Sequence, residues 1–461
     1  MRFTFRDLWR PTGTIDRGTY VLVGVLGFIL KHNLDRIIAT YGFHRRWGLF
    51  NYWEPLQNAG RVTGLHGDEA KFLATLVATA LPFIWVGVVL TLKRLRSAGA
   101  PTAFVILFFV PFFNLLFFLI LSLLPEQESG TSGSATVRNT SWLMRLVPES
   151  AIGSAAFSFL LTVPIGVCAA LLGTLYLVHY GWGLFVALPF TMGFMAAVVH
   201  GIRQPRSLSA CIVVAIISVA LLGGALLGLA FEGIICLAMA IPLAVPLAVF
   251  GGICGYLAQR RGDLRHSPAL LCIAIVFTPG AQLIEHIIAP PPQTFVVRSA
   301  IDINAAPEKV WKQVIAFSEI PAPQEWIFRA GVAYPIRAEI IGSGVGAERH
   351  CVFSTGAFVE PIQVWDEPHL LKFSVSENPP PMQEWTPYAH IDPPHLHGFL
   401  ISNGGQFLLT PLPNGGTRLE GTTWYRHGLW PANYWRLWSD QIIHRIHMRV
   451  LIHIRDEAQK S

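Results

Sequence analysis

Residues 298–311 read RSAIDINAAPEKVW, and this short stretch divides the chain into two physically different parts. Apolar and polar residues alternate up to Asn304, as in a half-buried strand. Pro307 then begins a short amphipathic helix through Val310, Trp311 and Val314, because proline suits the first turn of a helix. The preceding residues 1–290 are largely apolar. The stretch therefore predicts the beginning of a soluble α+β domain that follows a membrane region.

The composition separates the same two parts. The chain is 52% hydrophobic and 13% charged, with a mean hydropathy of +0.47, whereas soluble proteins are about 25% charged. Residues 1–290 carry a net charge of +8 and residues 291–461 a net charge of −2. A DNA-binding domain would concentrate basic residues on a soluble face. The basic pI thus belongs to the membrane part, and we expect no nucleic-acid partner.

The membrane part is predicted to be polytopic and α-helical. Crossing a hydrocarbon core of ~30 Å takes about 20 apolar residues. Six segments meet this requirement: Phe72–Leu92, Ala103–Leu124, Ile152–Val178, Trp182–Val199, Leu208–Ala230 and Gly233–Leu257. Two weaker segments, Val21–Tyr41 and Pro268–Ile288, bring the expected number to about eight transmembrane helices, with seven as the alternative. Lys31 and Asp35 in the first weak segment lie one helical turn apart and are expected to pair.

The sequence divides into four regions. Residues 1–124 form a three-span unit, the Gly/Ser-rich residues 125–150 a flexible linker, residues 151–290 a five-span unit, and residues 291–461 the soluble domain. The first unit resembles the YhaH-like family of bacterial inner-membrane proteins, a domain of unknown function. The residues that carry this resemblance are Gly13, Ile15, Arg17, Tyr20, Arg94-Leu95 and Gly99. That family usually has His-Asp after Arg-Leu, where this chain has Arg96-Ser97, so a role for that loop is in doubt.

The membrane topology is ambiguous from charge alone. We expect a bacterial inner (cytoplasmic) membrane protein, and eight spans with a cytoplasmic N-terminus also place the soluble domain in the cytoplasm. This arrangement puts Arg203, Arg206 and Arg260 outside, against the positive-inside rule. One span fewer places most basic loops on one side, but it also moves the soluble domain to the other side.

The soluble part is rich in predicted strands. The expected strands cover residues 338–341, 348–353, 358–365, 370–375, 406–412 and 417–426. Gly342-Ser-Gly-Val-Gly346 and Pro413-Asn-Gly-Gly416 are predicted hairpin turns, in which glycine supplies positive φ. A long helix is expected from Pro431, and it has to bury its apolar stripe against the sheet. The stripe residues are Trp435, Trp438, Ile442, Ile446, Val450 and Ile454.

This order of elements resembles the START-like, polyketide-cyclase-type (SRPBCC) helix-grip superfamily. The motifs that carry the resemblance are residues 301–311, Gly342-x-Gly-x-Gly-Ala-x-Arg349, Gly356-Ala-Phe-Val-Glu360 and Glu367-Pro-His-Leu-Leu-x-Phe373. The resemblance implies an antiparallel sheet that grips the long C-terminal helix, with a cavity for a hydrophobic ligand between them. The superfamily contains carriers, sensors and enzymes, so it does not imply a substrate.

Strand parity predicts which side chains line such a cavity. Arg349, Cys351 and Phe353 share one face of a strand, as do Phe358, Glu360 and Ile362 on the next. The candidate ligand-binding residues are Arg349, Phe353, Glu360, Phe373, Trp385, Tyr388, Tyr425 and Trp438. The same residues are also typical of a plain core with an internal Arg349–Glu360 ion pair. No catalytic residue is assigned, because no Cys–His or Ser–His–Asp arrangement is visible in the sequence.

The loop 377–398 combines prolines with aromatic and histidine side chains. His390, Asp392, His395 and His397 invite a metal-site interpretation, but the loop offers no fixed elements to hold the ligands. We expect it to be a mobile lid without bound metal, closing over the cavity through Trp385 and Tyr388. No spacing of cysteines indicates a zinc site or a disulfide framework, and no cofactor is expected.

Three functions follow from the sequence. The first is binding of a hydrophobic or lipid-like small molecule by the soluble domain, with membrane lipids as partners. The second is a cyclase- or hydrolase-type enzyme that uses the same cavity, with Glu360 or a histidine of the loop 377–398 as general acid/base. The third is a transporter regulated by the soluble domain. The sequence does not indicate the oligomeric state.

Overall fold

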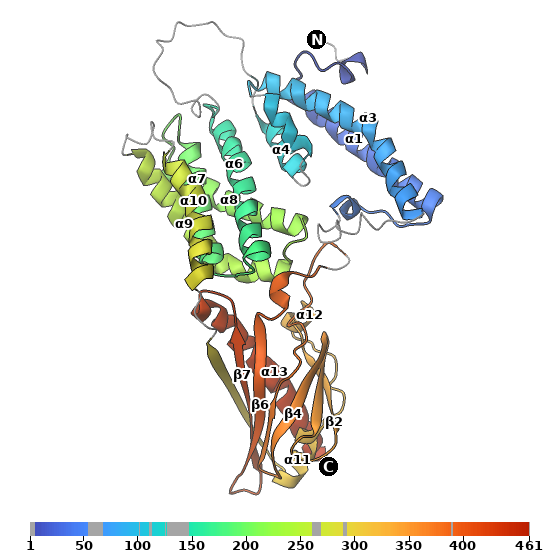
Figure 1. Ribbon diagram of the computed structural model, residues 1–461, viewed down its shortest axis with the longest axis vertical. Coiled ribbons are helices and arrows are strands. Elements are labelled where there is room, and N and C mark those ends of the chain that lie inside the picture. Colours follow the sequence, from blue (N-terminus) through green and yellow to red (C-terminus); the bar gives the residue numbers. More distant parts are fainter. Residues whose placement is uncertain are drawn as a thin grey trace.

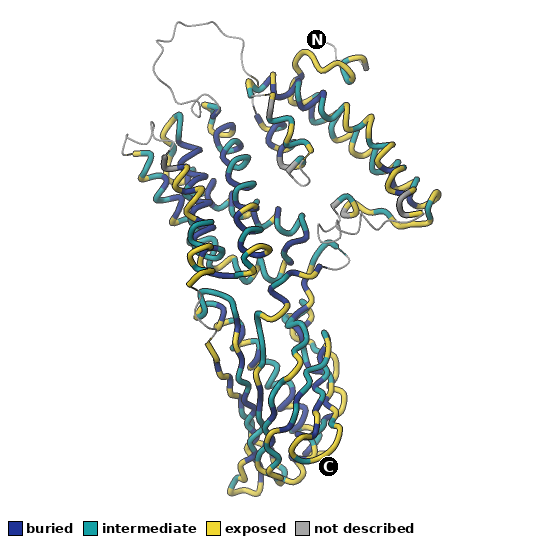
Figure 2. The backbone as a smooth tube through the Cα atoms, viewed as in Figure 1, coloured by how far each residue is buried: buried dark blue, intermediate teal, exposed yellow. Residues whose placement is uncertain are grey.

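The protein consists of a helical half joined end-on to a domain of one sheet and one long helix (Figure 1). The computed structural model describes residues 5–53, 68–100, 102–109, 113–124, 126, 147–260, 269–288, 293–388 and 391–460. Most of the linker expected at 125–150 lies outside the described residues. Buried positions occur in both halves, most densely along residues 183–200 of the helical half and at alternate positions of the strands in the second half (Figure 2).

The first half is helical throughout its described elements. They are η1 (Phe5–Leu8), α1 (Arg17–Ile37), η2 (Ile38–Gly42), η3 (Leu49–Trp53), α3 (Asp68–Ser97), η5 (Thr102–Phe109), α4 (Phe113–Leu123), α6 (Ala151–Leu171), η6 (Leu172–Tyr176), η7 (Gly183–Ala187), α7 (Leu188–His200), α8 (Leu208–Gly228), α9 (Ile234–Arg260) and α10 (Ala269–Ile288). Among the described residues, six helices are long and apolar enough to cross a membrane: Lys71–Ser97, Ala151–Tyr176, Gly183–His200, Leu208–Gly228, Ile234–Arg260 and Leu271–Ile288. They agree with five of the six strongly predicted segments and with the weaker segment from Pro268.

The span predicted at 103–124 is instead a pair of short helices, η5 and α4. At ~2.0 Å per residue in a 3₁₀-helix and ~1.5 Å in an α-helix, each covers only about 16 Å. Both ends of the pair lie at the same end of α3. The guanidinium of Arg94 donates to the carbonyls of Leu121 and Leu124, while Phe108 reaches back to Gly87, in the middle of α3. Apolar composition alone did not distinguish this hairpin from a continuous span.

Helix α1 is the other weak segment of the prediction. Its Lys31–Asp35 pair forms as expected, and Asp35 also accepts a hydrogen bond from the hydroxyl of Tyr52 at 2.7 Å. Because it contains charged residues, α1 is not among the six helices that are long and apolar enough to cross a membrane. The expected number of about eight transmembrane helices is therefore not confirmed.

Helices α7 and α9 approach each other at backbone contact. A Cβ placed on Gly193 would lie 2.1 Å from the carbonyl oxygen of Ala248, and one on Gly251 would lie 2.1 Å from that of Phe190. A Cβ on Gly255, one turn further along α9, would lie 2.7 Å from the Cβ of Ala197 and 2.8 Å from the carbonyl oxygen of Phe194. Small residues spaced by four positions allow membrane helices to approach closely and gain van der Waals contact. These glycines set the distance between the two helices.

The second half is a single antiparallel sheet with a long helix. Its elements are β1 (Thr294–Ile303), α11 (Pro307–Ile315), α12 (Trp326–Arg329), β2 (Pro335–Ile341), β3 (Glu348–Phe353), β4 (Gly356–Asp366), β5 (Leu370–Ser374), η9 (Pro394–Leu396), β6 (Leu400–Pro411), β7 (Thr417–His427) and α13 (Ala432–Lys460). The strand order is β1-β7-β6-β5-β4-β3-β2, so the chain returns to β1 after six strands. The predicted strands and both glycine turns are found, because alternating patterns and turn residues fix them locally. This is the expected helix-grip architecture.

The core of this domain lies between the sheet, α11 and α13. Val310, Trp311 and Val314 of α11 are fully buried in it, together with Val450 and Ile454 of α13. The predicted stripe of α13 is therefore correct at its C-terminal end. At its N-terminal end, Trp435 packs on Phe185 of η7, with ring centroids 4.7 Å apart. The first turn of α13 thus buries its stripe against the helical half instead of the sheet.

The two halves meet at a contact that we call the junction, made by residues 177–182 and 229–239 of the helical half and residues 382–399 and 429–435 of the soluble domain. Backbone hydrogen bonds cross it, from Trp430 N to Tyr180 O and from Ile234 N to Trp385 O, both 2.9 Å long. Glu384 accepts hydrogen bonds from the backbone N–H groups of Ile235 and Cys236, at 3.1 and 3.2 Å. A carboxylate of the soluble domain therefore caps the N-terminus of α9, where backbone N–H groups lack partners within the helix.

Candidate functional site

The residues predicted to line the helix-grip cavity do face the interior. Along β3, Arg349, Cys351 and Phe353 are buried and alternate with less buried neighbours. Glu360 on β4 lies directly opposite Arg349 in the register, and Phe373 on β5 is also buried. Strand parity thus predicted the inward faces correctly. Phe353 and Phe373 are part of the packed core of the domain.

Arg349 and Glu360 form a buried ion pair at the centre of this interior. The guanidinium lies over the rings of Phe317, Phe373 and Phe407, 5.5 to 5.6 Å from each centroid. Its Nε donates to the carbonyl of Ile315 at 3.1 Å, whereas its Nη2 is buried without a hydrogen-bond partner. Burial raises the pKa of Glu360, and the charge of Arg349 opposes this rise. Nη2 of Arg349 is therefore a hydrogen-bond donor for which the described residues supply no acceptor.

The other four predicted ligand-binding residues lie outside this centre. Tyr425 is buried near β1, and its hydroxyl contacts Ser439 and Asp440 of α13 at 2.7 and 2.5 Å. Trp438 is partly exposed on α13. Trp385 is 58% exposed, and the hydroxyl of Tyr388 donates to the carbonyl of Gly228 in the helical half.

The loop 377–398 lies against the helical half at the junction. Its backbone is tied by hydrogen bonds from Ala333 N to Pro381 O and from Gln383 N to Gly331 O, 3.0 and 2.8 Å long. Despite its prolines, the loop therefore has backbone hydrogen bonds, because residues 331–333 supply the partners. Its role as a lid remains a prediction. His390 lies outside the described residues.

The histidines of α13 do not form an exposed face. His447 is largely buried between α13 and the sheet: its Nε2 lies 2.7 Å from the hydroxyl of Thr423, and its Nδ1 lies 3.1 Å from that of Ser299. Burial lowers the pKa of His447 to about 4, and the neighbouring His444 adds to this effect. The sequence did not indicate that hydroxyl groups of the sheet would pair with His447.

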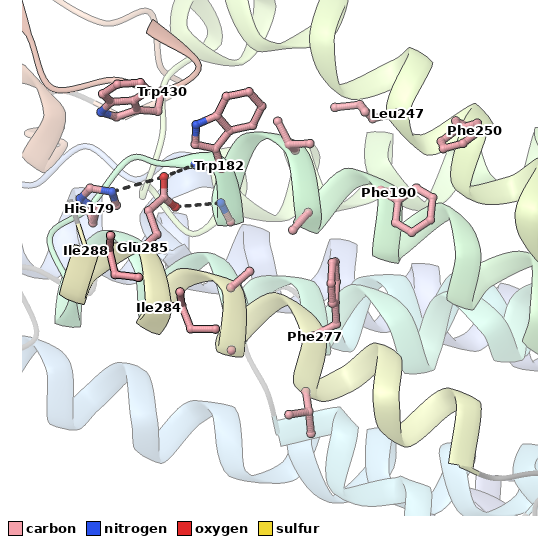
Figure 3. A pocket seen from close by; sticks show the side chains of 16 residues that line it. His179, Trp182, Phe190, Leu247, Phe250, Phe277, Ile284, Glu285, Ile288 and Trp430 are labelled. Carbon is pink, nitrogen blue, oxygen red and sulfur yellow. Dashed lines mark hydrogen bonds and ion pairs between the residues drawn. The ribbon is translucent and has the colours of Figure 1, made fainter. Parts of the chain in front are cut away.

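A second candidate site was not predicted from the sequence. A cavity of about 850 Å³ opens between η7–α7, α9 and α10, next to the junction (Figure 3). We call it the groove. Its walls are almost entirely apolar, and its lining residues are His179, Trp182, Gly183, Val186, Ala187, Phe190, Leu247, Phe250, Val276, Phe277, Gly280, Ala281, Ile284, Glu285, Ile288 and Trp430. Trp430 comes from the soluble domain and stands beside Trp182 at one end, whereas Phe190, Phe250 and Phe277 stand at the other.

Glu285 supplies the polar end of the groove. Its carboxylate accepts hydrogen bonds from Trp182 N and Gly183 N, at 2.6 and 3.0 Å, and lies 3.5 Å from Nε2 of His179. A Cβ on Gly181 would lie 2.2 Å from this carboxylate, so a larger residue there would displace the carboxylate from its present position. Glu285 is a charged residue near the end of an apolar helix, where a charge is costly unless it is solvated or has partners. The structure gives it backbone partners at the start of η7, where a helix N-terminus favours negative charge.

The signal for the groove was present but weak. Pro279-Gly280 and Glu285 were visible as breaks in the last apolar segment, yet α10 stays helical through Pro279. A Cβ on Gly280 meets no atom within 4 Å, and this empty space is part of the groove. A tertiary contact among three helices made the cavity, so no local pattern could reveal it.

Comparisons with known proteins concern the soluble domain. No family model matches the chain, and no curated protein matches it. Norcoclaurine synthase from Thalictrum flavum is 13% identical over 37% of this chain and 98% of its own, with a TM-score of 0.25. The Zhui aromatase/cyclase from Streptomyces sp. R1128 is 15% identical over 36% and 95%, with a TM-score of 0.23. Because these identities and TM-scores are low, the assignment of the helix-grip fold rests on the strand order and on α13. The comparisons do not support the resemblance of the first unit to the YhaH-like family.

Breaking the buried Arg349–Glu360 pair is expected to destabilise the soluble domain strongly. Glu360→Gln leaves the buried guanidinium without a counter-charge and should lower the free energy of unfolding by about 3–5 kcal/mol. Glu339→Gln removes the carboxylate of the exposed Arg337–Glu339 pair on the neighbouring β2 and should cost at most about 1 kcal/mol. Urea denaturation of a fragment from residue 293 measures both. Equal effects of the two substitutions would show that the buried pair is not a special contributor.

The stability of this domain should also fall in acid through His447. The folded-state pKa of about 4 lies below the unfolded value of ~6.5, so the unfolded chain binds the proton more readily. The stabilisation is therefore complete above pH 6.5 and is lost as the pH falls toward 4, by at most about 3 kcal/mol. Unfolding of His447→Gln should vary less with pH in this window. The control His369→Gln, in the β4–β5 turn, should follow the wild-type curve.

Proposed function

We propose that the protein binds an amphipathic, lipid-like molecule from the bilayer in the groove, beside its helix-grip domain. The observation that carries the proposal is an apolar cavity of about 850 Å³ that spans from the membrane helices to Trp430 of the soluble domain. Ligand pockets have volumes of roughly 300–1,000 Å³, apolar walls and a few convergent polar groups. The groove matches this description, with Glu285 and His179 as its polar end.

The groove is accessible from the lipid side. Phe250, Val276 and Ile284, which line it, are 57%, 66% and 59% exposed. In a bilayer these side chains contact acyl chains, so an apolar ligand can enter sideways without crossing water. Trp182 and Trp430 stand at the polar end, and tryptophan is enriched at the level of lipid headgroups. The ligand would therefore lie with its chain between α9 and α10 and its headgroup at the junction.

The charge distribution supports placing the soluble domain on the side of the membrane opposite the cytoplasm. In the five-span unit, Arg203, Arg206 and Arg260 lie at the ends of helices remote from the junction, while the loops 177–182 and 229–233 at the junction contain no Lys or Arg. The positive-inside rule assigns the remote side to the cytoplasm. The pair η5–α4 returns to the side of the membrane from which it enters, so it does not cross. Helix α1 and the six apolar helices then make seven crossings. An odd number of crossings places the N-terminus opposite the soluble domain, that is, in the cytoplasm. This reverses the side expected from an eight-span count.

The interior of the helix-grip domain is the second candidate for the ligand site. It is favoured by Nη2 of Arg349, which is buried without a partner and could donate to a carbonyl or carboxylate of a ligand. The enzyme hypothesis has less support, since a general acid/base must exchange protons with a substrate. Glu360 instead is held by Arg349 among phenyl rings.

Filling the groove should abolish lipid binding. Gly280→Phe places a phenyl ring in space where a Cβ meets no atom within 4 Å, so the helices need not move. Gly224 on α8 is equally open and lies outside the groove lining, which makes Gly224→Phe the matched control. Native mass spectrometry of the full chain in detergent should detect a bound lipid in the wild type and in Gly224→Phe, and at least 10-fold less in Gly280→Phe. Equal retention by both variants would move the ligand to another site, with the Arg349 interior as the next to test.

A reporter at the C-terminal end tests the proposed side. Alkaline phosphatase, which is active outside the cytoplasm, should be active when fused after α13, while a green fluorescent protein fusion should stay dark after Sec export. A fusion after Arg260 should give the opposite pattern, since the end of α9 lies on the basic side. Fluorescence of the C-terminal fusion would restore the cytoplasmic placement and restrict the ligand to the inner leaflet.

A further inference from the structure

Three side chains with metal-binding chemistry meet at the junction, although two come from the helical half and one from the soluble domain. Glu232 lies in the loop before α9, Cys236 in the first turn of α9, and His395 in η9. One donor atom of each lies within 4.8 Å of the other two. Sγ of Cys236 is 2.8 Å from Nε2 of His395, and Oε2 of Glu232 is 3.4 Å from Nδ1 of the same ring.

We propose that Glu232, Cys236 and His395 bind a divalent transition-metal ion of the Zn²⁺ class, which fixes the soluble domain to the membrane helices. Thiolate, imidazole and carboxylate are the ligands that Zn²⁺ takes in proteins. Bond lengths of ~2.0–2.3 Å place tetrahedral ligands about 3.5 Å apart. Donor atoms that lie within 4.8 Å of one another therefore have to approach by up to about 1.3 Å to reach this spacing.

The state of His395 is an independent observation that points to a ligand. The residue is 8% exposed, and its Nδ1 is buried without a hydrogen-bond partner among the described residues, despite the nearby Glu232 carboxylate. A buried imidazole normally has a partner for each nitrogen. The edge of the ring is approached by Tyr180, whose ring centroid is 5.4 Å away, so water has little access. Coordination would give this side chain the missing interaction.

The surrounding charges favour a cation over a reactive thiol. Cys236, His395 and Glu232 also have the order of a nucleophile, a base and an orienting carboxylate. However, a second carboxylate, Glu384, lies 3.9 Å from Nε2 of His395 and binds the N–H of Cys236. Two carboxylates around one sulfur destabilise a free thiolate, whereas a divalent ion stabilises all three anions together. Since Glu384 is engaged by α9, the fourth position of the metal is left to water.

The expected consequence of this site is mechanical. The ligands come from both sides of the junction, so the ion joins α9 to the loop 377–398 by direct bonds. Loss of the ion frees this loop and, with it, the position of Trp430 at the end of the groove. The sequence favoured a metal-free loop because the loop alone offers no fixed set of ligands, and Glu232 and Cys236 lie about 160 residues away.

Metal titration of the full chain in detergent tests the proposal. After treatment with a chelator, the wild type should bind one Zn²⁺ per chain, and Co²⁺ in its place should give the near-ultraviolet charge-transfer absorption of a cobalt–thiolate bond. Cys236→Ser and His395→Gln should each weaken Zn²⁺ binding more than about 100-fold, because loss of an outer partner alone costs roughly 10–100-fold. Cys254→Ser, also on α9, and His397→Gln, whose side chain pairs with Asp392 at 2.5 Å, should bind Zn²⁺ as the wild type does.

Amide exchange of residues 383–396 provides a second readout that does not depend on the variants. Zn²⁺ should slow exchange of this loop in the wild type at least 10-fold, and in Cys236→Ser it should have no effect. The proposal is overturned by a chain without stoichiometric Zn²⁺ or the cobalt–thiolate absorption. It is equally overturned by Zn²⁺ binding that survives Cys236→Ser but not His397→Gln. Rapid alkylation of Cys236 by iodoacetamide in the presence of excess Zn²⁺ would likewise show a free thiol.

Discussion

The N-termini of the membrane helices at the junction determine how this protein is assembled. The first N–H groups of a helix have no partner within it, and near a bilayer an unmet group is costly. Glu384 of the soluble domain supplies the partner for α9, and Glu285 of α10 supplies it for η7. Both carboxylates are in turn stabilised by the positive end of the helix dipole. The soluble domain is thus part of the boundary of the membrane helices.

Close helix packing follows on the membrane side of that boundary. Gly193 and Gly251 bring α7 and α9 to backbone contact. The groove opens beside this contact, between η7–α7, α9 and α10. Its polar end coincides with the Glu285 cap, so one carboxylate both completes a helix and marks the place where a headgroup would lie.

The soluble domain uses its interior charges differently. Arg349 and Glu360 neutralise each other across two strands, and three phenyl rings cover the guanidinium. A buried pair of this kind is weak evidence for net stability but strongly destabilising when broken. Nη2 of Arg349 has no hydrogen-bond partner among the described residues, so the interior of this domain stays the second candidate for the ligand site. Ligand entry from the bilayer is the simpler route for the groove, since its walls face lipid.

The sequence by itself determined the elements whose cause is local. Alternation and turn glycines gave β3 to its exact ends and the inward faces of Arg349 and Glu360, and apolar length gave five of the six strongly predicted spans. Tertiary structure alone decided what depends on contacts between distant residues. The returning pair η5–α4 is as apolar as a span, the groove is a gap among three helices, and His395 meets Cys236 only because the loop 377–398 docks on α9. The periodicity within a segment does not predict such a contact, because each residue fits the pattern of its own segment whether or not the contact forms.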